Sequence, residues 1–289
     1  MTIDSKKYED ANAFRKALED RLKNIAREQA TPLDRLRRRI TFDRFLARLF
    51  DRHNPRPQWL LKGGYALEFR FHNIARTTKD VDFSIPSIKN ADENAIRAML
   101  QDEVKKDLSD WFIFYIGVPM REFDQAVYGG WRYPVEARVA NRIFTKFHTD
   151  VGIGDAVISN AEWKKGEDIL QFAGIKPAYV AILPIEQHFA EKIHAYSYPR
   201  DKRPFSRMRD LVDLVLLIEQ GLPEKKLVLS AIKATFTRRG THDIPQVLEV
   251  PPEILVDSYR QLAEDCGVAK KTMVEAFSFL QKYWARIIK

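Results

Sequence analysis

Two aspartates, Asp80 and Asp82, flank one apolar residue, Val81, and their spacing points directly to a possible chemistry. Alternate residues of a β-strand project from the same face, so the two carboxylates would lie side by side while Val81 enters the core. Carboxylates so close repel each other unless a cation lies between them, and Mg²⁺ or Mn²⁺ prefers such hard oxygen ligands. An Asp-x-Asp pair alone is more often a solvated strand end, but it also predicts a divalent-metal site.

A glycine pair, Gly63 and Gly64, precedes a short stretch with helical periodicity. Glycine lets the backbone approach a phosphate closely, and a helix N-terminus favours the negative charge of that phosphate. A Gly-Gly pair alone usually marks only a tight turn. The order of glycine turn, helix and strand with paired carboxylates is nevertheless what nucleotidyl transfer requires, because backbone amides hold the triphosphate and carboxylates hold the metal.

A third carboxylate, Asp150, lies near the end of the apolar segment 144–151, which we predict to be a strand beside the first. Three acids on adjacent strands can hold two metal ions, one at the attacking hydroxyl and one at the triphosphate and its leaving pyrophosphate. An aspartate that caps the turn at 152–154 is an equally open alternative. The predicted metal set is therefore Asp80, Asp82 and Asp150.

Two helical segments in the second half supply the remaining candidates. Lys192 lies beside the apolar stripe of the segment 185–195, where a lysine contacts a phosphate or, more commonly, extends into solvent. Asp210 and Asp213 are three residues apart in the segment 208–219 and so share one helix face. On that face Asp210 would pair with Lys192 or bind a base edge, although simple electrostatics at a helix start explains these acids about as well.

These residues need a scaffold of mixed α/β type. Apolar periodicity predicts helices at 8–29, 32–50 and 91–108, strands at 59–61, 81–85, 112–117, 133–140 and 143–151, and a turn at 51–58. Beyond residue 184 the pattern is helical, with segments at 185–195, 208–219, 225–238, 252–262 and 271–288. We expect an α/β (α+β) domain with N-terminal helices at 1–183 and a helical bundle at 184–289.

Composition narrows the class of protein. The chain has 289 residues, a formal net charge of +8 and one cysteine, Cys266, so a disulfide framework is excluded. Zinc-site spacing, a Gly-x-Ser-x-Gly elbow and a P-loop motif are absent from the sequence, which argues against zinc hydrolases, serine hydrolases and P-loop NTPases. Without a signal-peptide pattern or an apolar run of membrane-spanning length, we expect a cytoplasmic protein with no membrane partner.

The positive charge is concentrated in the second predicted helix. A basic helix of this kind is a tRNA- or antitoxin-facing surface or, more commonly, a solvated face. Net charge alone is equally compatible with a nucleic-acid partner and with none. The arginines concerned are Arg35, Arg37, Arg38, Arg39, Arg44 and Arg48.

The segments 61–67 and 76–84 together resemble the first motif of the AbiEii/AbiGii (MenT-type) nucleotidyltransferase toxins of bacterial toxin–antitoxin systems. Further matches follow in the same order: Asp150 resembles the third acid of the family, Glu191-Lys192 its lysine motif, and the segment 209–214 its Lys/Arg-Asp-x-x-Asp-Leu motif. The resemblance extends over about residues 59–219.

This resemblance implies a DNA-polymerase-β-like nucleotidyltransferase core with a C-terminal helical bundle. It implies a metal-dependent enzyme that uses a nucleoside triphosphate, and several members transfer nucleotides to the 3′ acceptor end of tRNA, which blocks aminoacylation and translation. A cognate AbiEi-like antitoxin is then an expected partner, as in type IV toxin–antitoxin systems.

The same resemblance assigns roles to residues. Many relatives of the wider superfamily have Gly-Ser where this chain has Gly63-Gly64, so a hydroxyl contact to phosphate is missing and Lys62 or Tyr65 would have to replace it. The expected catalytic residues are Asp80, Asp82, Lys192 and Asp210. The expected nucleotide-binding residues are Lys62, Gly63, Gly64, Thr78, Lys192 and Asp210.

Three functions remain open at this point. The first is a metal-dependent nucleotidyltransferase that acts on tRNA, and the second is the same enzyme with a protein hydroxyl or a small molecule as acceptor. The third is a non-enzymatic nucleic-acid-binding protein that uses the arginine-rich helix and needs no aspartate pair. The joint order of the motifs, rather than the charge, favours the first function.

Overall fold

The computed structural model describes residues 8–50, 57–87, 91–122, 129–199 and 207–289. Its centre is a mixed eight-stranded sheet in the order β3-β5-β6-β2-β1-β8-β7, with β4 paired to β5. The strands are β1 (Leu60–Lys62), β2 (Asp80–Ile85), β3 (Phe112–Ile116), β4 (Arg121–Glu122), β5 (Gly130–Val139), β6 (Arg142–Ile153), β7 (Glu162–Lys165) and β8 (Tyr179–Ile182).

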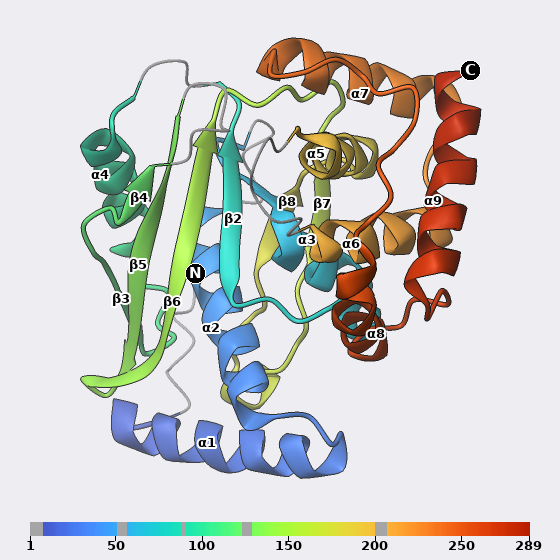
Figure 1. Cartoon of the computed structure of the whole chain (residues 1–289). Helices are drawn as coiled ribbons and strands as arrows, with labels where there is room; N and C mark the ends of the chain where they lie inside the picture. Colours follow the sequence, from blue (N-terminus) through green and yellow to red (C-terminus); the bar gives the residue numbers. More distant parts are fainter. Residues whose placement is uncertain (1–7, 51–56, 88–90, 123–128, 200–206) are drawn as a thin grey trace.

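Helices lie behind, below and on both sides of this sheet (Figure 1). In the described ranges, none of them is both long enough and apolar enough to cross a membrane. The α-helices are α1 (Ala11–Glu28), α2 (Leu33–Leu49), α3 (Gly63–Phe71), α4 (Glu93–Val104), α5 (Ile185–Ser197), α6 (Met208–Glu219), α7 (Lys225–Arg239), α8 (Val256–Glu264) and α9 (Met273–Ile288).

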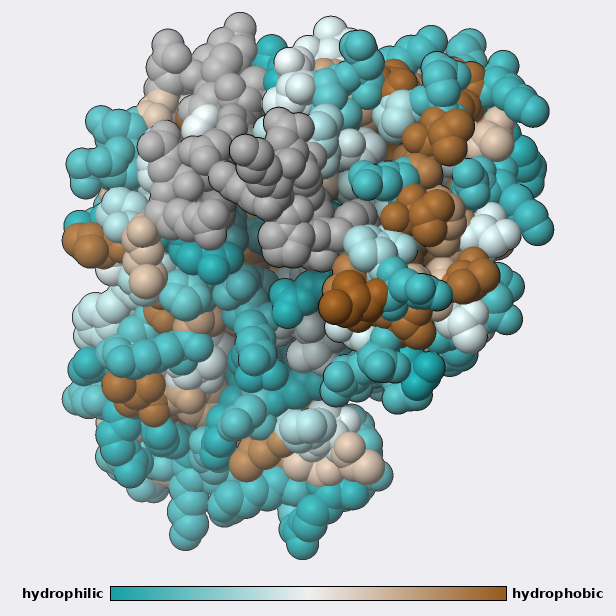
Figure 2. All heavy atoms as spheres, viewed as in Figure 1, coloured by the Kyte–Doolittle hydropathy of each residue, from teal (hydrophilic) through white to brown (hydrophobic). Residues whose placement is uncertain are grey.

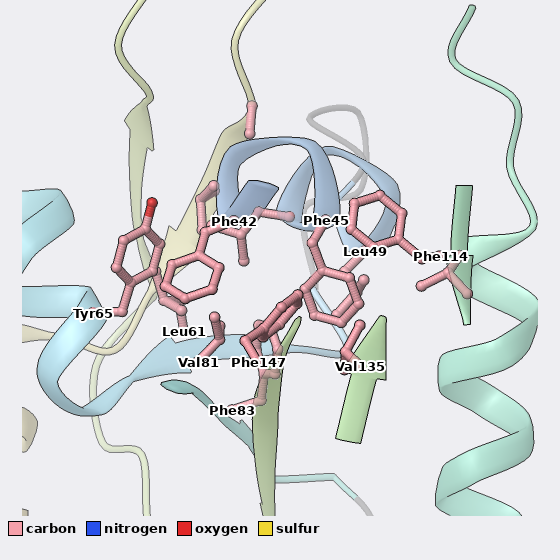
Figure 3. Packing of buried hydrophobic residues seen from close by; sticks show 14 of the residues in the cluster. Phe42, Phe45, Leu49, Leu61, Tyr65, Val81, Phe83, Phe114, Val135 and Phe147 are labelled. Carbon is pink, nitrogen blue, oxygen red and sulfur yellow. The ribbon is translucent and has the colours of Figure 1, made fainter. Parts of the chain in front are cut away.

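Helix α2 covers one face of the sheet and builds the larger core (Figure 3). Phe42 and Phe45 of α2 pack on Phe147 of β6 with ring centroids 4.9 and 5.3 Å apart. Val81 and Phe83 of β2 are fully buried in the same cluster. Because side chains alternate along a strand, the aspartates on either side of Val81 project from the opposite face, which α2 leaves free.

The C-terminal helices α5–α9 lie beside the sheet, on the side of β2 that faces away from β5 and β6 (Figure 1). They form a second core, to which α3 contributes Leu67 and the following segment contributes Ala75. Since two residues of the first half complete this second core, the division of the chain at 183/184 stays a proposal.

The predicted α/β fold is confirmed, with corrections at the level of single elements. Gly63 and Gly64 form the first turn of α3 rather than a turn before it, and the fourth helix is shorter than predicted, beginning after its N-cap Asp92. Strands β4, β7 and β8 were not predicted; β4 pairs with β5, β8 pairs in parallel with β1, and β7 pairs with β8. The turn expected at 51–58 lies mostly outside the described residues.

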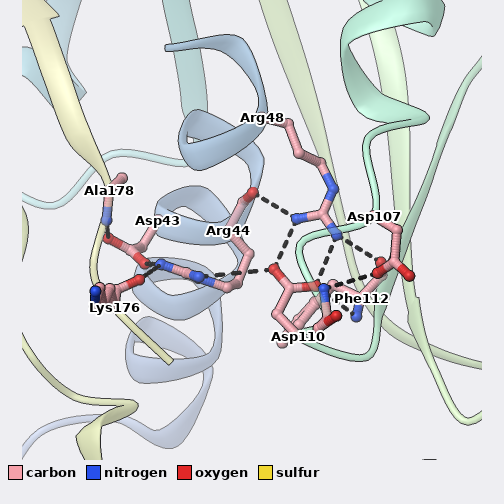
Figure 4. Close-up of polar contacts among 9 residues, drawn as sticks. Asp43, Arg44, Arg48, Asp107, Asp110, Phe112, Lys176 and Ala178 are labelled. Atoms are coloured by element: carbon pink, nitrogen blue, oxygen red, sulfur yellow. Dashed lines mark hydrogen bonds and ion pairs between the residues drawn. The ribbon is translucent and has the colours of Figure 1, made fainter. Parts of the chain in front are cut away.

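The arginine-rich face of α2 is neither a solvated face nor an open basic surface. Arg48 donates two hydrogen bonds to Asp110, at 2.8 and 2.7 Å, and both side chains are almost inaccessible (Figure 4). Arg44 is equally buried and pairs with Asp43. Three further ion pairs are Arg35–Glu68, Arg37–Glu19 and Arg39–Glu167, so five of the six arginines have a carboxylate partner. Most of the charge of α2 is therefore compensated by carboxylates of the chain itself.

Candidate active site

The sheet brings the three predicted metal ligands together. Strands β2 and β6 run parallel, and their register places Asp82 opposite Asp150 and Asp80 opposite His148. Asp150 lies inside β6, whose last residue is Ile153, so the alternative of a turn cap is wrong. The three carboxylates thus occupy one face of two adjacent strands.

The carboxylate of Asp82 is in the least favourable electrostatic position of the three. Burial, followed by the charge of Asp150, raises the pKa of Asp82 to about 7, although Lys192 and Lys62 act in the opposite direction. Such a group is half protonated near neutral pH and ionises fully when a cation is bound beside it. This is the electrostatic condition expected of a metal ligand in the absence of its metal.

An arginine that the sequence analysis did not single out holds the third acid. Arg132 of β5 lies opposite Asp150 in the antiparallel register and donates hydrogen bonds of 2.8 and 2.7 Å to its two carboxylate oxygens. The same guanidinium reaches Asp80 at 3.4 Å. Its hydrogen bonds to Asp150 raise the pKa of Arg132. Arg132 therefore already binds two of the three predicted metal ligands, Asp150 and Asp80, so a metal ion would compete with it for them.

The contacts of Arg132 determine which of the three carboxylates can bind a metal ion. Within the described ranges, no three His, Cys, Asp or Glu side chains converge as a ready-made metal site. Mg²⁺ commonly binds one or two protein carboxylates and completes its shell with substrate phosphates and water. Asp80 and Asp82 fit that requirement as a pair, whereas Asp150 becomes a ligand only if Arg132 releases it. The role of Asp150 in metal binding stays a prediction.

The N-terminus of α3 lies at the level of Asp82, because Lys62 is the register partner of Asp82. Gly63 has a φ of +67°, and a Cβ placed there would lie 1.9 Å from Oδ2 of Asp82, so only glycine fits. In the described part of the chain, no side chain caps this first turn of α3. Its first-turn amides therefore have no described side-chain partner, and they lie beside the Asp82 carboxylate, where a helix N-terminus favours a phosphate.

The surroundings of Gly64 are crowded for any side chain. A Cβ at this position would lie 2.9 Å from Nη2 of Arg76 and 3.2 Å from Oγ1 of Thr78. The Thr78 hydroxyl therefore lies close to where a serine side chain would begin. Tyr65 is excluded as a substitute, because it packs in the first core with its ring 4.7 Å from that of Phe42 (Figure 3).

Lys192 links the two helices that carry the other candidates. Its Nζ lies 2.9 Å from Asp210 and 2.8 Å from Asp213, and its side chain is only 13% exposed, so the expectation of a solvent-extended lysine is wrong. Arg76, from the segment before β2, binds Asp213 through two hydrogen bonds of 2.9 and 2.8 Å. The two cations hold the pKa of Asp213 well below its usual range even though the carboxylate is buried.

A second buried ion cluster adjoins the site on the β1 side. Lys62 pairs with Asp155 and, at 3.3 Å, with Glu191, and Arg239 of α7 contacts the same two acids at 3.1 and 3.8 Å. Ser84 donates a further hydrogen bond to Asp155 at 3.0 Å. Lys62 is thus on the same face as Asp82 but is engaged by two acids, and its contact with nucleotide stays a prediction.

Comparisons with known proteins agree with this geometry. A family model described as "Nucleotidyl transferase AbiEii toxin, Type IV TA system" matches residues 44–282. Among solved structures, the nucleotidyltransferase toxin MenT4 from Mycobacterium tuberculosis H37Rv is similar over 92% of this chain and 98% of that chain, with 16% identity and a TM-score of 0.57. This similarity shows a shared fold.

A second solved structure, the antibiotic-resistance factor ANT(2'')-Ia, is similar over 70% of this chain and 92% of that chain, with 14% identity. Its TM-score of 0.34 is too low to support an argument. No curated protein shows a significant sequence match to the chain.

Proposed function

Because this chain belongs to the AbiEii nucleotidyltransferase toxin family of type IV toxin–antitoxin systems, we propose that it transfers nucleotides from a nucleoside triphosphate to the 3′ acceptor end of tRNA, which blocks aminoacylation and translation. The observation that supports this most directly is the position of the α3 N-terminus at Asp82, with Gly63 required between them. A phosphate-binding helix end beside paired carboxylates is the arrangement that metal-dependent nucleotidyl transfer needs.

In this proposal the triphosphate lies between α3 and the helical bundle. The amides of the first turn of α3 and the Thr78 hydroxyl bind its phosphates, and Lys192 neutralises part of their charge. Asp210 holds Lys192 in place through its 2.9 Å ion pair. Asp80 and Asp82 hold the divalent cation, Mg²⁺ or Mn²⁺, which when bound supplies charge neutralisation and Lewis-acid activation.

The acceptor hydroxyl approaches Asp82 from the opposite direction. Strand β1 and α3 lie on one side of β2, and β6 with Asp150 lies on the other. The triphosphate occupies the first side, so the side of β6 is left for the acceptor. This places the 3′ hydroxyl next to Asp150 and in line with the phosphate that it attacks.

The proposal is tested with purified protein, Mg²⁺, total tRNA and each labelled nucleoside triphosphate in turn. We expect label at the 3′ end of tRNA with the wild type and none with Asp80→Ala. Asp102→Ala is the matched control, because Asp102 is 76% exposed on α4 and pairs only with its helix neighbour Lys105 among the contacts described.

Two outcomes would contradict parts of the proposal. Labelled tRNA from the Asp80→Ala protein would contradict the metal-binding role of this aspartate. A labelled protein or small molecule, with no RNA product from any of the four triphosphates, would show that the acceptor is not tRNA.

The biological setting forms a second part of the proposal. The family implies a cognate antitoxin, and we propose that it is AbiEi-like and that the protein acts in the cytoplasm. Co-expression with the product of an adjacent AbiEi-like reading frame should restore growth that the toxin alone inhibits. Growth inhibition that persists with every such neighbour would contradict this part.

A further inference from the structure

The face that carries the carboxylates continues well beyond them. Figure 1 shows β6 and β5 in front of α2, with no described helix across their near side. Strand alternation places on this face the side chains of Tyr115, Glu136, Arg138, Lys146 and His148. In Figure 2 the same region is mainly hydrophilic, with a few hydrophobic residues toward the β3 edge.

Strand β3 exposes large apolar groups on this polar face. Tyr115 is 51% exposed and Ile113 is 47% exposed, whereas their neighbours on the strand are buried in the first core. Arg138 of β5 lies over the Tyr115 ring, with its guanidinium carbon 5.2 Å from the ring centroid. An exposed aromatic ring beside a planar guanidinium is a platform on which a nucleobase can stack.

Cations accompany this platform along the strands. Lys146 is 65% exposed, and it shares Glu136 with Arg138, at N···O distances of 3.1 and 2.6 Å. Hydrogen bonds from Arg138 and Lys146 lower the pKa of Glu136, so one negative charge faces two positive charges. His148 follows toward the site, with Nδ1 3.5 Å from Asp80. The surplus positive charge suits a phosphate backbone.

The position of this surface fits the approach of an acceptor strand. In the sheet order, β6, β5 and β3 lie on the side of β2 opposite to β1 and α3, where the triphosphate is proposed to bind. Lys146 precedes Asp150 by four residues on β6, which corresponds to about 13 Å along the strand. That length accommodates roughly four stacked nucleotides.

We propose that this surface, which we call the acceptor track, binds the single-stranded 3′ end of the RNA acceptor and guides it to Asp150. Its bases stack on the Tyr115–Arg138 platform, and its phosphates contact Lys146 and His148. The inference rests on the proposed function for the identity of the acceptor and adds the residues that recognise it.

The experiment measures direct binding, so that it does not depend on catalysis. A fluorescent single-stranded RNA with a tRNA-like 3′ end is titrated with full-length protein over a range of salt concentrations. We expect Tyr115→Ser to weaken binding about tenfold with no change in the salt slope, because a stacked base is lost. Lys146→Gln should weaken binding and reduce the salt slope by about one, because one phosphate contact is lost.

Matched controls lie at the other edge of the sheet. Tyr179 on β8 is 40% exposed and stacks on Trp163, and Lys165 on β7 is exposed. Tyr179→Ser and Lys165→Gln should bind the RNA as tightly as the wild type does. Thermal unfolding of all four variants verifies that each one is folded.

The outcomes separate the acceptor track from the proposed function. RNA binding that both track variants weaken, without any nucleotide transfer by the wild type, would support the track and contradict the activity. Nucleotide transfer to tRNA with unchanged RNA affinity and unchanged KM for tRNA in both track variants would overturn the track alone. A wild type that binds no RNA would overturn the track as well.

Discussion

On the face of the sheet that α2 covers, Arg48 and Asp110 are both almost inaccessible and bind each other through two hydrogen bonds. On the opposite face, Asp82 is half-buried beside a second carboxylate, Asp150, and desolvation raises its pKa to about 7. On the first face, the buried charges of Arg48 and Asp110 neutralise each other. On the second face, the carboxylates of Asp82 and Asp150 repel each other, and a divalent cation would relieve that repulsion. The contrast separates a neutralised pair, which we expect to stabilise the fold, from carboxylates that we propose for metal binding.

Among the substitutions that test this contrast, we expect the largest loss of stability from a substitution at Arg48. Arg48→Ala leaves Asp110 buried without its main partner, so we expect a loss of about 3–5 kcal/mol in the free energy of unfolding. Chemical denaturation measures this loss. Lys23→Ala is the control, because Lys23 is 57% exposed and should change stability by less than about 0.5 kcal/mol. An Arg48→Ala protein of wild-type stability would contradict the structural role assigned to this pair.

A second prediction concerns Gly63, which lies at the start of α3 against the Asp82 carboxylate. Gly63→Ala forces a Cβ against the Asp82 carboxylate at a φ of +67°, so we expect a loss of about 2–3 kcal/mol in stability and of nearly all transferase activity. Gly221→Ala is the control, since it has a φ of +94° with open space around it and should cost only backbone strain. Equal activity losses in the two variants would contradict the steric argument.

The third prediction is a substitution that raises the stability of the protein, whereas most substitutions lower it. The folded pKa of Asp82 lies above that of an unfolded aspartate, so ionisation on raising the pH from 5.5 to 7 destabilises the metal-free protein. Asp82→Asn removes this penalty and should be more stabilising at pH 8 than at pH 5.5 by roughly 2 kcal/mol, while transferase activity is lost. Thermal unfolding at both pH values, without metal, measures the difference. A stability gain that is independent of pH would contradict the assignment.

The smallest effect is expected at Gly64. Gly64→Ser places its Cβ close to the flexible end of Arg76, which can move but then weakens its bonds to Asp213. We expect a stability loss of about 1 kcal/mol and a rise in the KM for the triphosphate of a few-fold. Steady-state kinetics with varied triphosphate measures this change. A lower KM would show instead that the serine hydroxyl adds a phosphate contact to that of Thr78.

The sequence predicted those features of the site that depend on a single helix or strand. The Asp80–Asp82 alternation, the glycine pair and the three-residue spacing of Asp210 and Asp213 all follow from the geometry of single elements. The pairing of Lys192 with Asp210 was one of two predicted alternatives, and it is confirmed. The Asp80–Asp82 alternation and the Asp210–Asp213 spacing needed only the period of a strand or a helix, whereas the Lys192–Asp210 pair joins α5 and α6.

Long-range pairing was harder to predict, and Arg132 shows why. Counting back from the hairpin turn at 140–141 places Trp131, not Arg132, opposite Asp150. A register shift between Ala137 and Arg138 moves the pairing by one residue and brings Arg132 to the acid. Such an irregularity has no reliable sequence signal, yet it decides which side chain meets the carboxylate.

The arginines of α2 illustrate a different error, in which the sequence suggested more exposed charge than the structure has. Their density indicated a basic surface, but their partners Glu19, Glu68, Asp110 and Glu167 come from distant segments of the chain. A charge count cannot reveal such partners, because it treats each side chain as if it faced solvent. Strands β4, β7 and β8 were missed for a different reason, because two to four residues are too few to show a period.

The contribution of Leu67 and Ala75 to the second core has a consequence during the synthesis of the protein on the ribosome. Helix α6 is synthesised roughly 130 residues after Ala75, which at about 5–20 residues per second is a delay on the order of ten seconds. Throughout that interval the two side chains lack the helices that cover them, and α3 lacks Lys192 and Asp210, with which we propose that it binds the nucleotide. A translating ribosome therefore carries a nascent chain whose proposed nucleotide site is incomplete, and that site is complete only after residues 185–219 have been made.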